Sequence, residues 1–257
     1  MKHLFFLAIA IISIAMVSCT KQIVGEGPII TQTLDIDDFS KLTLDSSFDV
    51  YIEQGSEQTV VAEGHENIIN KLNVAVSNNT LTAELSEGSY TNIQLKLFIT
   101  TPLLSEIKND GSGDIEIASM NVDNLLIDLQ GSGNVVINNE MGIAQQLQLE
   151  SDGSGNIKIE ALNTNDLVAK LKGSGDVKIE NGLVNELDLL VDGSGDAKLF
   201  GLETANCMVT SDGSGDTEIN VTDNLDIQIM GSGDVSYMGN PTINITDDGS
   251  GDLIDAN

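Results

Sequence analysis

The acidic residues beside a repeated glycine turn are the part of the sequence best suited to chemistry. Asp192, Asp196, Asp212 and Asp216 flank two successive Gly-Ser-Gly triplets. Four carboxylates on two stacked turns would provide the oxygen ligands that calcium prefers. The same aspartates can instead cap each turn by accepting hydrogen bonds from its backbone. The sequence leaves both roles open, and calcium is the one cofactor that it suggests.

The remaining candidates for catalysis are few. After the first eighteen residues the one histidine is His65, which we expect in a solvated polar turn, Glu63-Gly64-His65-Glu66. Cys207 stands where sister repeats carry leucine, so we expect a buried, inert thiol. The repeated serines have no histidine or lysine placed beside each of them and indicate a structural ladder. No pair of carboxylates stands out as a glycosidase pair. We therefore predict that the protein is not an enzyme.

An internal repeat must position these residues. Successive Gly-Ser-Gly triplets are spaced 20, 22, 20, 20, 20, 18 and 18 residues apart, and each is followed by Asp or Asn. A period near 20 residues is typical of one supersecondary unit stacked along an axis. The eight triplets begin at Gly111, Gly131, Gly153, Gly173, Gly193, Gly213, Gly231 and Gly249.

Apolar residues alternate with polar ones on both sides of each triplet. In the fourth copy, Leu167, Ala169 and Leu171 precede the triplet, and Val177 and Ile179 follow it. Alternation with period two indicates β-strands, and glycine allows the close backbone approach that a corner needs. Each repeat therefore predicts a strand, a corner, a second strand and a looser return. Stacked repeats of this kind predict a β-helix with coils of about 20 residues.

Residues 30–105 lack the triplet but keep short alternating strands, and we expect them to form irregular first coils and an N-terminal cap. Asn78-Asn79 stands between two such strands and indicates a hairpin turn. Residues 106–257 carry the regular repeats. Together, residues 30–257 predict one elongated all-β domain.

The N-terminus has the pattern of a lipoprotein signal. Lys2 and His3 precede the apolar run from Leu4 to Val17, and Ser18-Cys19 follows. A small residue directly before cysteine is typical of lipoprotein cleavage, after which the cysteine carries acyl chains. We expect residues 1–18 to be the signal, Cys19 to be lipidated and residues 19–29 to be a tether. An ordinary signal peptide cut elsewhere is the alternative.

Charge excludes several classes of partner. The chain has 11 lysines, no arginine and 40 acidic residues, for a formal charge of −29. Removing residues 1–18 removes one lysine and no acid, so the charge of the remainder is −30. Such a chain repels nucleic acid and anionic headgroups. Tryptophan is absent and there are three tyrosines, which offers few aromatic platforms for sugars.

Several segments outside and within the repeats resemble one bacterial family in their order along the chain. They are Asp38-Phe39, Phe48-Asp49-Val50-Tyr51-Ile52-Glu53-Gln54-Gly55, Ile99-Thr100-Thr101-Pro102-Leu103, the Gly-Ser-Gly-Asp repeats and the segment from Gly233 to Pro241. From about Thr31 onward, the sequence resembles the "putative autotransporter adhesin, head GIN domain" family. The resemblance implies a single-stranded right-handed parallel β-helix, shaped like pectin lyases without their catalytic residues, often on lipid-anchored envelope proteins. It transfers no catalytic or binding residue.

These observations lead to a set of functional expectations. We expect a non-enzymatic envelope lipoprotein that acts as an adhesion or scaffold module with a repetitive acidic surface. A polysaccharide-binding or polysaccharide-degrading β-helix protein is the alternative. The expected partners are a membrane, through the N-terminal lipid, and a glycan or an envelope protein, with no nucleic acid. The expected location is the outer membrane of a Gram-negative bacterium.

Overall fold

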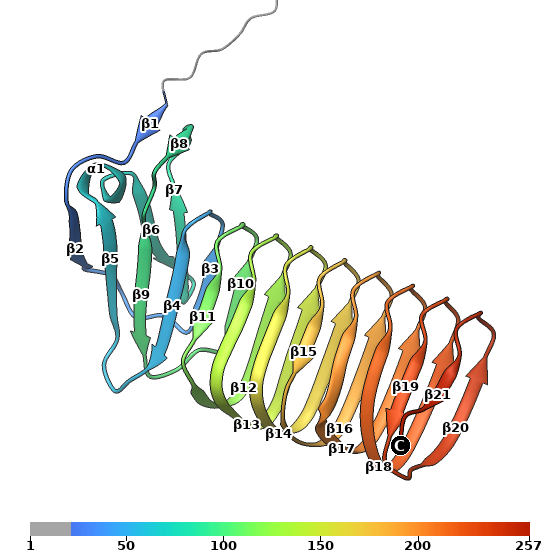
Figure 1. Cartoon of the computed structure of the whole chain (residues 1–257). Coiled ribbons are helices and arrows are strands. Elements are labelled where there is room, and N and C mark those ends of the chain that lie inside the picture. The colour runs from blue at the N-terminus through green and yellow to red at the C-terminus, as the bar shows by residue number, and fades with distance from the viewer. Residues whose placement is uncertain (1–21) are drawn as a thin grey trace, which may run out of the picture.

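The computed structural model describes residues 22–257, which form a parallel β-helix with a strand-rich cap at its N-terminal end (Figure 1). The β-helix predicted from the repeats is therefore confirmed. The proposed signal, residues 1–18, and Cys19 lie outside the described residues. Among the described residues, helix is confined to the single turn α1 (Glu66–Ile69). Within residues 22–257, no helix has the length and apolar character needed to cross a membrane.

Each coil contributes a strand before its corner and a strand after it. The strands before the corners belong to β10 (Glu106–Asn109), β12 (Met120–Leu129), β13 (Val135–Ser151), β14 (Ile157–Leu171), β16 (Gly182–Val191), β17 (Ala197–Ser211), β18 (Thr217–Ile229) and β20 (Thr242–Asp247). The strands after the corners belong to β11 (Ile115–Ile117), β15 (Val177–Ile179), β19 (Val235–Met238), β21 (Leu253–Asp255) and the first residues of β13, β14, β17 and β18. The four long strands thus run from one corner around the return to the next.

Parallel pairing stacks equivalent residues in columns. Leu147, Leu167, Leu187, Cys207 and Leu225 are aligned partners on consecutive coils. The register shifts in several places, among them between Ile137 and Glu140 and between Ile143 and Gln146, and each of these two shifts accommodates one of the two extra residues of that coil. Elsewhere, residues one repeat apart are aligned on consecutive coils. This register keeps the apolar residues inside, because a slip of one residue would turn them outward.

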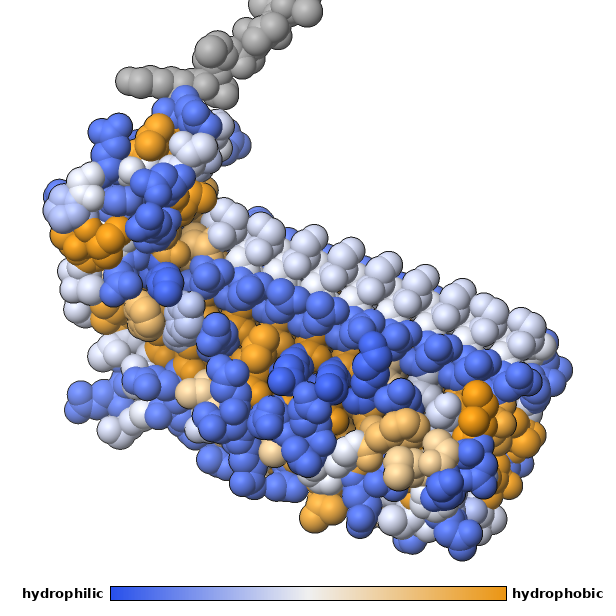
Figure 2. Space-filling view, in the orientation of Figure 1, coloured by the Kyte–Doolittle hydropathy of each residue, from blue (hydrophilic) through white to orange (hydrophobic). Residues whose placement is uncertain are grey.

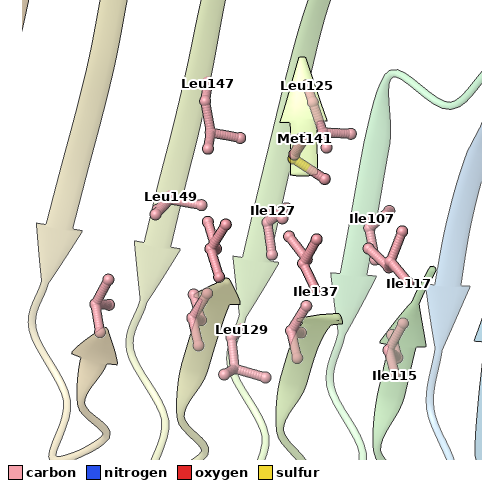
Figure 3. Close-up of a cluster of buried hydrophobic side chains, with 14 of the residues drawn as sticks. Ile107, Ile115, Ile117, Leu125, Ile127, Leu129, Ile137, Met141, Leu147 and Leu149 are labelled. Atoms are coloured by element: carbon pink, nitrogen blue, oxygen red, sulfur yellow. The ribbon is translucent and has the colours of Figure 1, made fainter. Parts of the chain in front are cut away.

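The inward columns form one continuous core. In Figure 3, Ile107, Ile127 and Leu149 lie on neighbouring strands before the corners, and Ile117 and Ile137 lie on strands after them. All five side chains are at most 1% exposed. Fully burying an aliphatic side chain stabilises a fold by about 1.5–3 kcal/mol. The alternation read from the sequence is therefore the alternation that fills the core.

The first coil lies between the cap and the second coil. It consists of β3 (Lys41–Leu44) and β4 (Asp49–Gln54), which pair with β10 and β11 on one side. On the other side they pair with β7 (Thr80–Leu85) and β9 (Lys96–Thr101), also in parallel. The segment between β4 and β10 thus leaves the first coil and forms the strands that pair with it on the cap side. The chain then continues as β10 on the opposite side of the first coil. Spatial order and sequence order differ here.

Antiparallel strands complete the cap. β5 (Thr59–His65) pairs with β9, β2 (Ile29–Leu34) pairs with β5, and β6 (Leu72–Ser77) pairs with β7. The β6–β7 hairpin turns at Asn78 and Asn79, whose φ angles are 50° and 66°, as the sequence predicts. Antiparallel strands at this end cover the open edge that a solenoid would otherwise expose.

Residues 23–28, expected within a tether, contact the cap. β1 (Ile23–Val24) pairs with β8 (Tyr90–Thr91), and the Gly25 amide donates a hydrogen bond of 2.9 Å to the Thr91 carbonyl. The Asn67 side chain donates to the Val24 carbonyl at 2.7 Å and accepts from the Glu26 amide at 3.1 Å. The described part of the expected tether is therefore hydrogen-bonded to the fold.

The inward and outward columns lead to a test with adjacent residues. Ile179 is 1% exposed in the core, whereas Lys178 is exposed and its Nζ lies 3.0 Å from Glu180 Oε1. Ile179→Asp should destabilise the protein by more than about 3 kcal/mol, because it buries an unpaired charge. Lys178→Asp should cost about 1 kcal/mol, from one exposed ion pair. Urea unfolding of both variants measures the difference, and equal destabilisation would contradict the register.

Candidate functional site

The corners are formed by backbone packed on backbone. The Ser194 amide donates to the Gly173 carbonyl at 2.9 Å, and the Ser214 amide donates to the Gly193 carbonyl at 2.8 Å. A Cβ added to Gly195 would lie 2.0 Å from the Gly175 carbonyl oxygen, so no larger residue fits without a shift. The stacked corners form the pale ridge along the solenoid in Figure 2. The glycines of the repeat are therefore required by close approach.

The residue that follows each triplet forms a second ladder. Asp176 Oδ1 accepts a hydrogen bond of 2.9 Å from the Asp196 amide, and Asp196 Oδ1 accepts one of 3.0 Å from the Asp216 amide. The same contact joins Asp114 to Asn134, Asn134 to Asn156, Asn156 to Asp176, Asp216 to Asp234, and Asp234 to Asp252, with distances of 2.7–3.0 Å. Each side chain thus satisfies a corner amide of the next coil.

Lys198 neutralises part of this column. Its Nζ lies 2.7 Å from Asp176 Oδ2 and 3.1 Å from Asp196 Oδ2. Burial raises the pKa of Asp176, but the Asp196 amide and the Lys198 ammonium outweigh it, so the pKa lies below its ordinary value. The hydrogen bonds to Asp176 and Asp196 raise the pKa of Lys198. Asp196 therefore uses both of its carboxylate oxygens within the protein.

Asp192 and Asp212 lie on the other side of the corner. Both are exposed, and they line an open hollow of ≈ 500 Å³ together with Lys172 and the neighbouring triplets. No group of three or more His, Cys, Asp or Glu side chains arranged to hold a metal occurs within residues 22–257. The ladder gives Asp196 and Asp216 a structural task, and calcium binding by the four aspartates stays a prediction.

His65 differs from its expected position. The expectation of a solvated turn is wrong, since His65 is 7% exposed at the end of β5. Its Nδ1 lies 2.8 Å from the Gly27 carbonyl oxygen, and its Nε2 lies 3.3 Å from Asn92 Nδ2. The imidazole thereby joins the N-terminal segment to the cap. A polar turn sequence could not reveal that residues distant in the chain cover it.

Cys207 has the expected position in the core. It is 4% exposed and aligned with Leu187 and Leu225. Burial raises the pKa of its thiol far above the usual range, and the nearby charge of Asp188 adds to the effect. Since the thiolate is the reactive form, this cysteine is unsuited to nucleophilic chemistry.

Sequence reasoning missed that the ladder of hydrogen-bonded Asp and Asn side chains begins one coil before the first Gly-Ser-Gly triplet. The segment Asp45-Ser46-Ser47-Phe48 makes the first corner without glycine, and the Ser112 amide donates to the Ser46 carbonyl at 2.9 Å. Asp49 Oδ1 accepts from the Asp114 amide at 3.2 Å, which makes Asp49 the first residue of the ladder. The signal was present, because Leu42, Leu44, Val50 and Ile52 flank this corner as the apolar residues flank the triplets.

Sequence reasoning also missed an aromatic pair on the outer surface. Tyr51 of β4 and Phe98 of β9 are aligned partners whose ring centroids lie 5.1 Å apart with an interplanar angle of 20°. Their alternating strands mark both as outward residues. Nothing local indicates that β4 pairs with β9, so their contact could not be predicted.

The fold and the corner ladders define a class of protein. It is a β-solenoid in which repeated polar side chains accept hydrogen bonds from the backbone of the neighbouring coil. The chain belongs to the family described as "putative auto-transporter adhesin, head GIN domain", whose model matches residues 38–241. This confirms the resemblance found in the sequence. A search of curated proteins gave no match.

Solved structures share the fold over nearly the whole chain. A putative adhesin from Parabacteroides distasonis has a TM-score of 0.84 at 23% identity, covering 90% of this chain and 98% of that one. A protein from the same species, described as a putative lipid binding protein, has a TM-score of 0.80 at 28% identity, covering 91% and 100%. A putative adhesin from Bacteroides fragilis has a TM-score of 0.69 at 27% identity, covering 90% and 98%.

Calcium and simple screening make different predictions for the acidic columns. A specific site in the folded state would make millimolar calcium raise the melting temperature, and Asp196→Asn with Asp216→Asn would abolish the gain. Asparagine keeps an Oδ1 acceptor, as Asn134 and Asn156 do, so the double variant should fold. We expect screening instead, with sodium or magnesium at matched ionic strength stabilising the protein as much as calcium. A saturable calcium heat in a calorimetric titration would contradict this expectation.

Proposed function

We propose that the protein is a non-enzymatic adhesion or scaffold module of the cell envelope. Membership of a family described as putative adhesins supports the adhesion role. The observation that carries the non-enzymatic role is the aspartate ladder, in which the polar residue that recurs after each triplet serves the next coil. A motif with a structural task in every coil does not mark one coil as a reaction centre.

The chemistry of the two best nucleophile and base candidates supports the same proposal. Cys207 is a buried thiol with a strongly raised pKa, and His65 is held between Gly27 and Asn92. The nearby Asp188 raises the pKa of the Cys207 thiol instead of activating it. The hydrogen-bond partners of His65 are the Gly27 carbonyl and the Asn92 amide, neither of them an acid or a base. The proposed module acts through its shape and surface.

We place the module on a membrane through acyl chains on Cys19, in the outer membrane of a Gram-negative bacterium. The apolar run that ends in Ser18-Cys19 supports lipidation. Two or three acyl chains bind a bilayer stably without a membrane-spanning helix. The acidic solenoid would then extend from the membrane surface, and its charge of about −30 would keep it apart from anionic headgroups.

A glycan or an envelope protein is the proposed partner. Polysaccharide binding is the second candidate function, and it is compatible with adhesion because an adhesin can bind a sugar. The stacked pair of half-buried Tyr51 and exposed Phe98 favours it, since aromatic rings provide apolar platforms with defined geometry.

Binding without turnover is the direct test of the proposed function. The processed full chain, applied to a glycan array and to immobilised envelope proteins, should give saturable binding to one of these classes. Incubation with the same polysaccharides should release no new reducing ends, as expected of a module that binds without cleaving. Release of reducing ends would contradict the non-enzymatic role, and no saturable binding would contradict adhesion.

Anchoring has its own test. Cys19→Ala should abolish incorporation of radiolabelled palmitate and leave precursor of higher mass, because the acyl acceptor is lost. The processed wild-type chain should sediment with outer-membrane fractions and the variant should not. Ser154→Ala, in an exposed part of a corner, serves as the control and should label like the wild type. Palmitate labelling that persists in Cys19→Ala would refute the lipid anchor.

A further inference from the structure

The aromatic pair is an exception within its own outward column. On successive coils the residues aligned with Tyr51 and Phe98 are Glu116, Val136, Lys158, Lys178, Lys198 and Glu218. Val50, Ile52, Leu97 and Ile99 point inward and are at most 2% exposed, so the two rings between them point outward. The Phe98 side chain is 38% exposed. Two stacked rings thus lie on the surface where the cap meets the first coil.

A hollow of ≈ 220 Å³ lies against these rings. Its polar walls are Glu53, Thr100, Glu116 and Asn138, and Ala118 leaves the space open. Thr100 Oγ1 donates to Glu53 Oε1 at 3.0 Å, and Asn138 Nδ2 donates to Glu116 Oε2 at 3.3 Å. Within residues 22–257 no ion pair involves either glutamate. Each carboxylate therefore keeps one oxygen free as an acceptor.

The size of the hollow limits the ligand. Sites for drug-sized molecules usually measure about 300–1,000 Å³, so this hollow suits a single ring. It opens to the surface, which would let a longer chain continue outward from that ring. An aromatic wall facing acceptor groups fits a ligand with one apolar face and several hydroxyl donors.

The charges of the hollow limit the ligand further. Two carboxylates without a cationic partner repel sulfate, phosphate and uronate groups. The position over the Tyr51 ring that attracts a cation is already taken, since Lys96 Nζ lies 5.1 Å from the ring centroid. The chain's own ammonium thus disfavours a second cation beside the aromatic pair. The two glutamates alone could attract a cation, but acceptor groups that face an aromatic wall favour a neutral ligand with hydroxyl donors.

We infer that this hollow binds one neutral hexopyranose unit of a glycan, with its C–H face against the more exposed of the two stacked rings, Phe98, and its hydroxyls on Glu53, Glu116 and Asn138. The inference deepens the proposed adhesion function and rests on it for biological meaning. One ring bound at an open surface gives weak affinity, with a dissociation constant of about 1 mM. Adhesion would then gain strength from many anchored copies on one surface.

Saturation-transfer NMR of the processed full chain tests the site with named probes. The neutral probes are methyl glucoside, methyl galactoside, methyl mannoside and methyl N-acetylglucosaminide, with glucuronate and choline as charged probes. We expect saturable binding of at least one neutral glycoside, with transfer mainly to protons on one face of the ring. Neither charged probe should bind. No saturable binding of any neutral glycoside would overturn the proposal, and so would binding of choline or glucuronate at this site.

Variants assign the binding to the hollow. Phe98→Ala and Phe98→Leu should both weaken glycoside binding about tenfold, because both remove the stacked ring. The leucine variant keeps apolar volume and so separates lost stacking from lost folding, which thermal melting checks. Leu183→Ala is the matched control, since Leu183 is 58% exposed elsewhere on the solenoid. Equal loss in the control, or unchanged binding in Phe98→Leu, would overturn the assignment.

A charge-neutral variant separates sugar binding from cation binding. Glu53→Gln with Glu116→Gln keeps acceptors and shape, so glycoside affinity should change less than about threefold. Choline binding that is seen with the wild type and lost in this variant would point to a cationic ligand and overturn the proposal. Adhesion to the glycan array that persists in Phe98→Leu would show that the adhesion function stands while this site fails.

Discussion

Close backbone contact at the corner is the constraint on which the rest of the structure depends. Each triplet glycine faces a carbonyl of the preceding coil, and an added Cβ at Gly133, Gly155 or Gly175 would lie 1.8–2.0 Å from that oxygen. Such contact fixes the height and the direction of the chain at the same point of every coil. The following strand then begins in register, and its apolar residues continue the inward columns. The regular ridge in Figure 2 and the continuous core in Figure 3 both follow from this contact.

Stacking equivalent residues also brings like charges close together. In the ladder, this repulsion is offset because the aspartates accept hydrogen bonds from the backbone. Neighbouring members of a column lie about 4.8 Å apart, so like charges in it repel. In the ladder, each aspartate instead accepts a backbone amide, and Lys198 joins two of its carboxylates. The pKa of Asp176 is lowered in the folded state by these contacts. Its contribution to stability is therefore present at neutral pH and is lost as the pH falls through the folded-state pKa.

The regular coils could be predicted from the sequence, whereas the cap and the hollow could not. In the repeats, each strand pairs with the chain 17 to 22 residues away, so the spacing of the triplets gives the partners and, beside the corners, the register. Cys207 and Ile179 could be placed in the core for this reason. Where the cap meets the first coil, β3 pairs with a strand 65 residues later and also with β7, and nothing in an alternating strand specifies such partners. His65, Tyr51 and Phe98 acquire their surroundings from those distant pairings.

The two ends of the described solenoid differ in how they meet solvent. At the N-terminal end the cap covers the first coil with antiparallel strands (Figure 1). At the other end, β20 pairs with β18 and β21 pairs with β19, and the inward columns change from Ile229 to Asp247 and from Tyr237 to Asp255. A strand added beside β20 and β21 would bury these carboxylates, which is costly. Charge at inward positions of the last described coil therefore disfavours the stacking of another strand against it, as charged residues do on other exposed sheet edges.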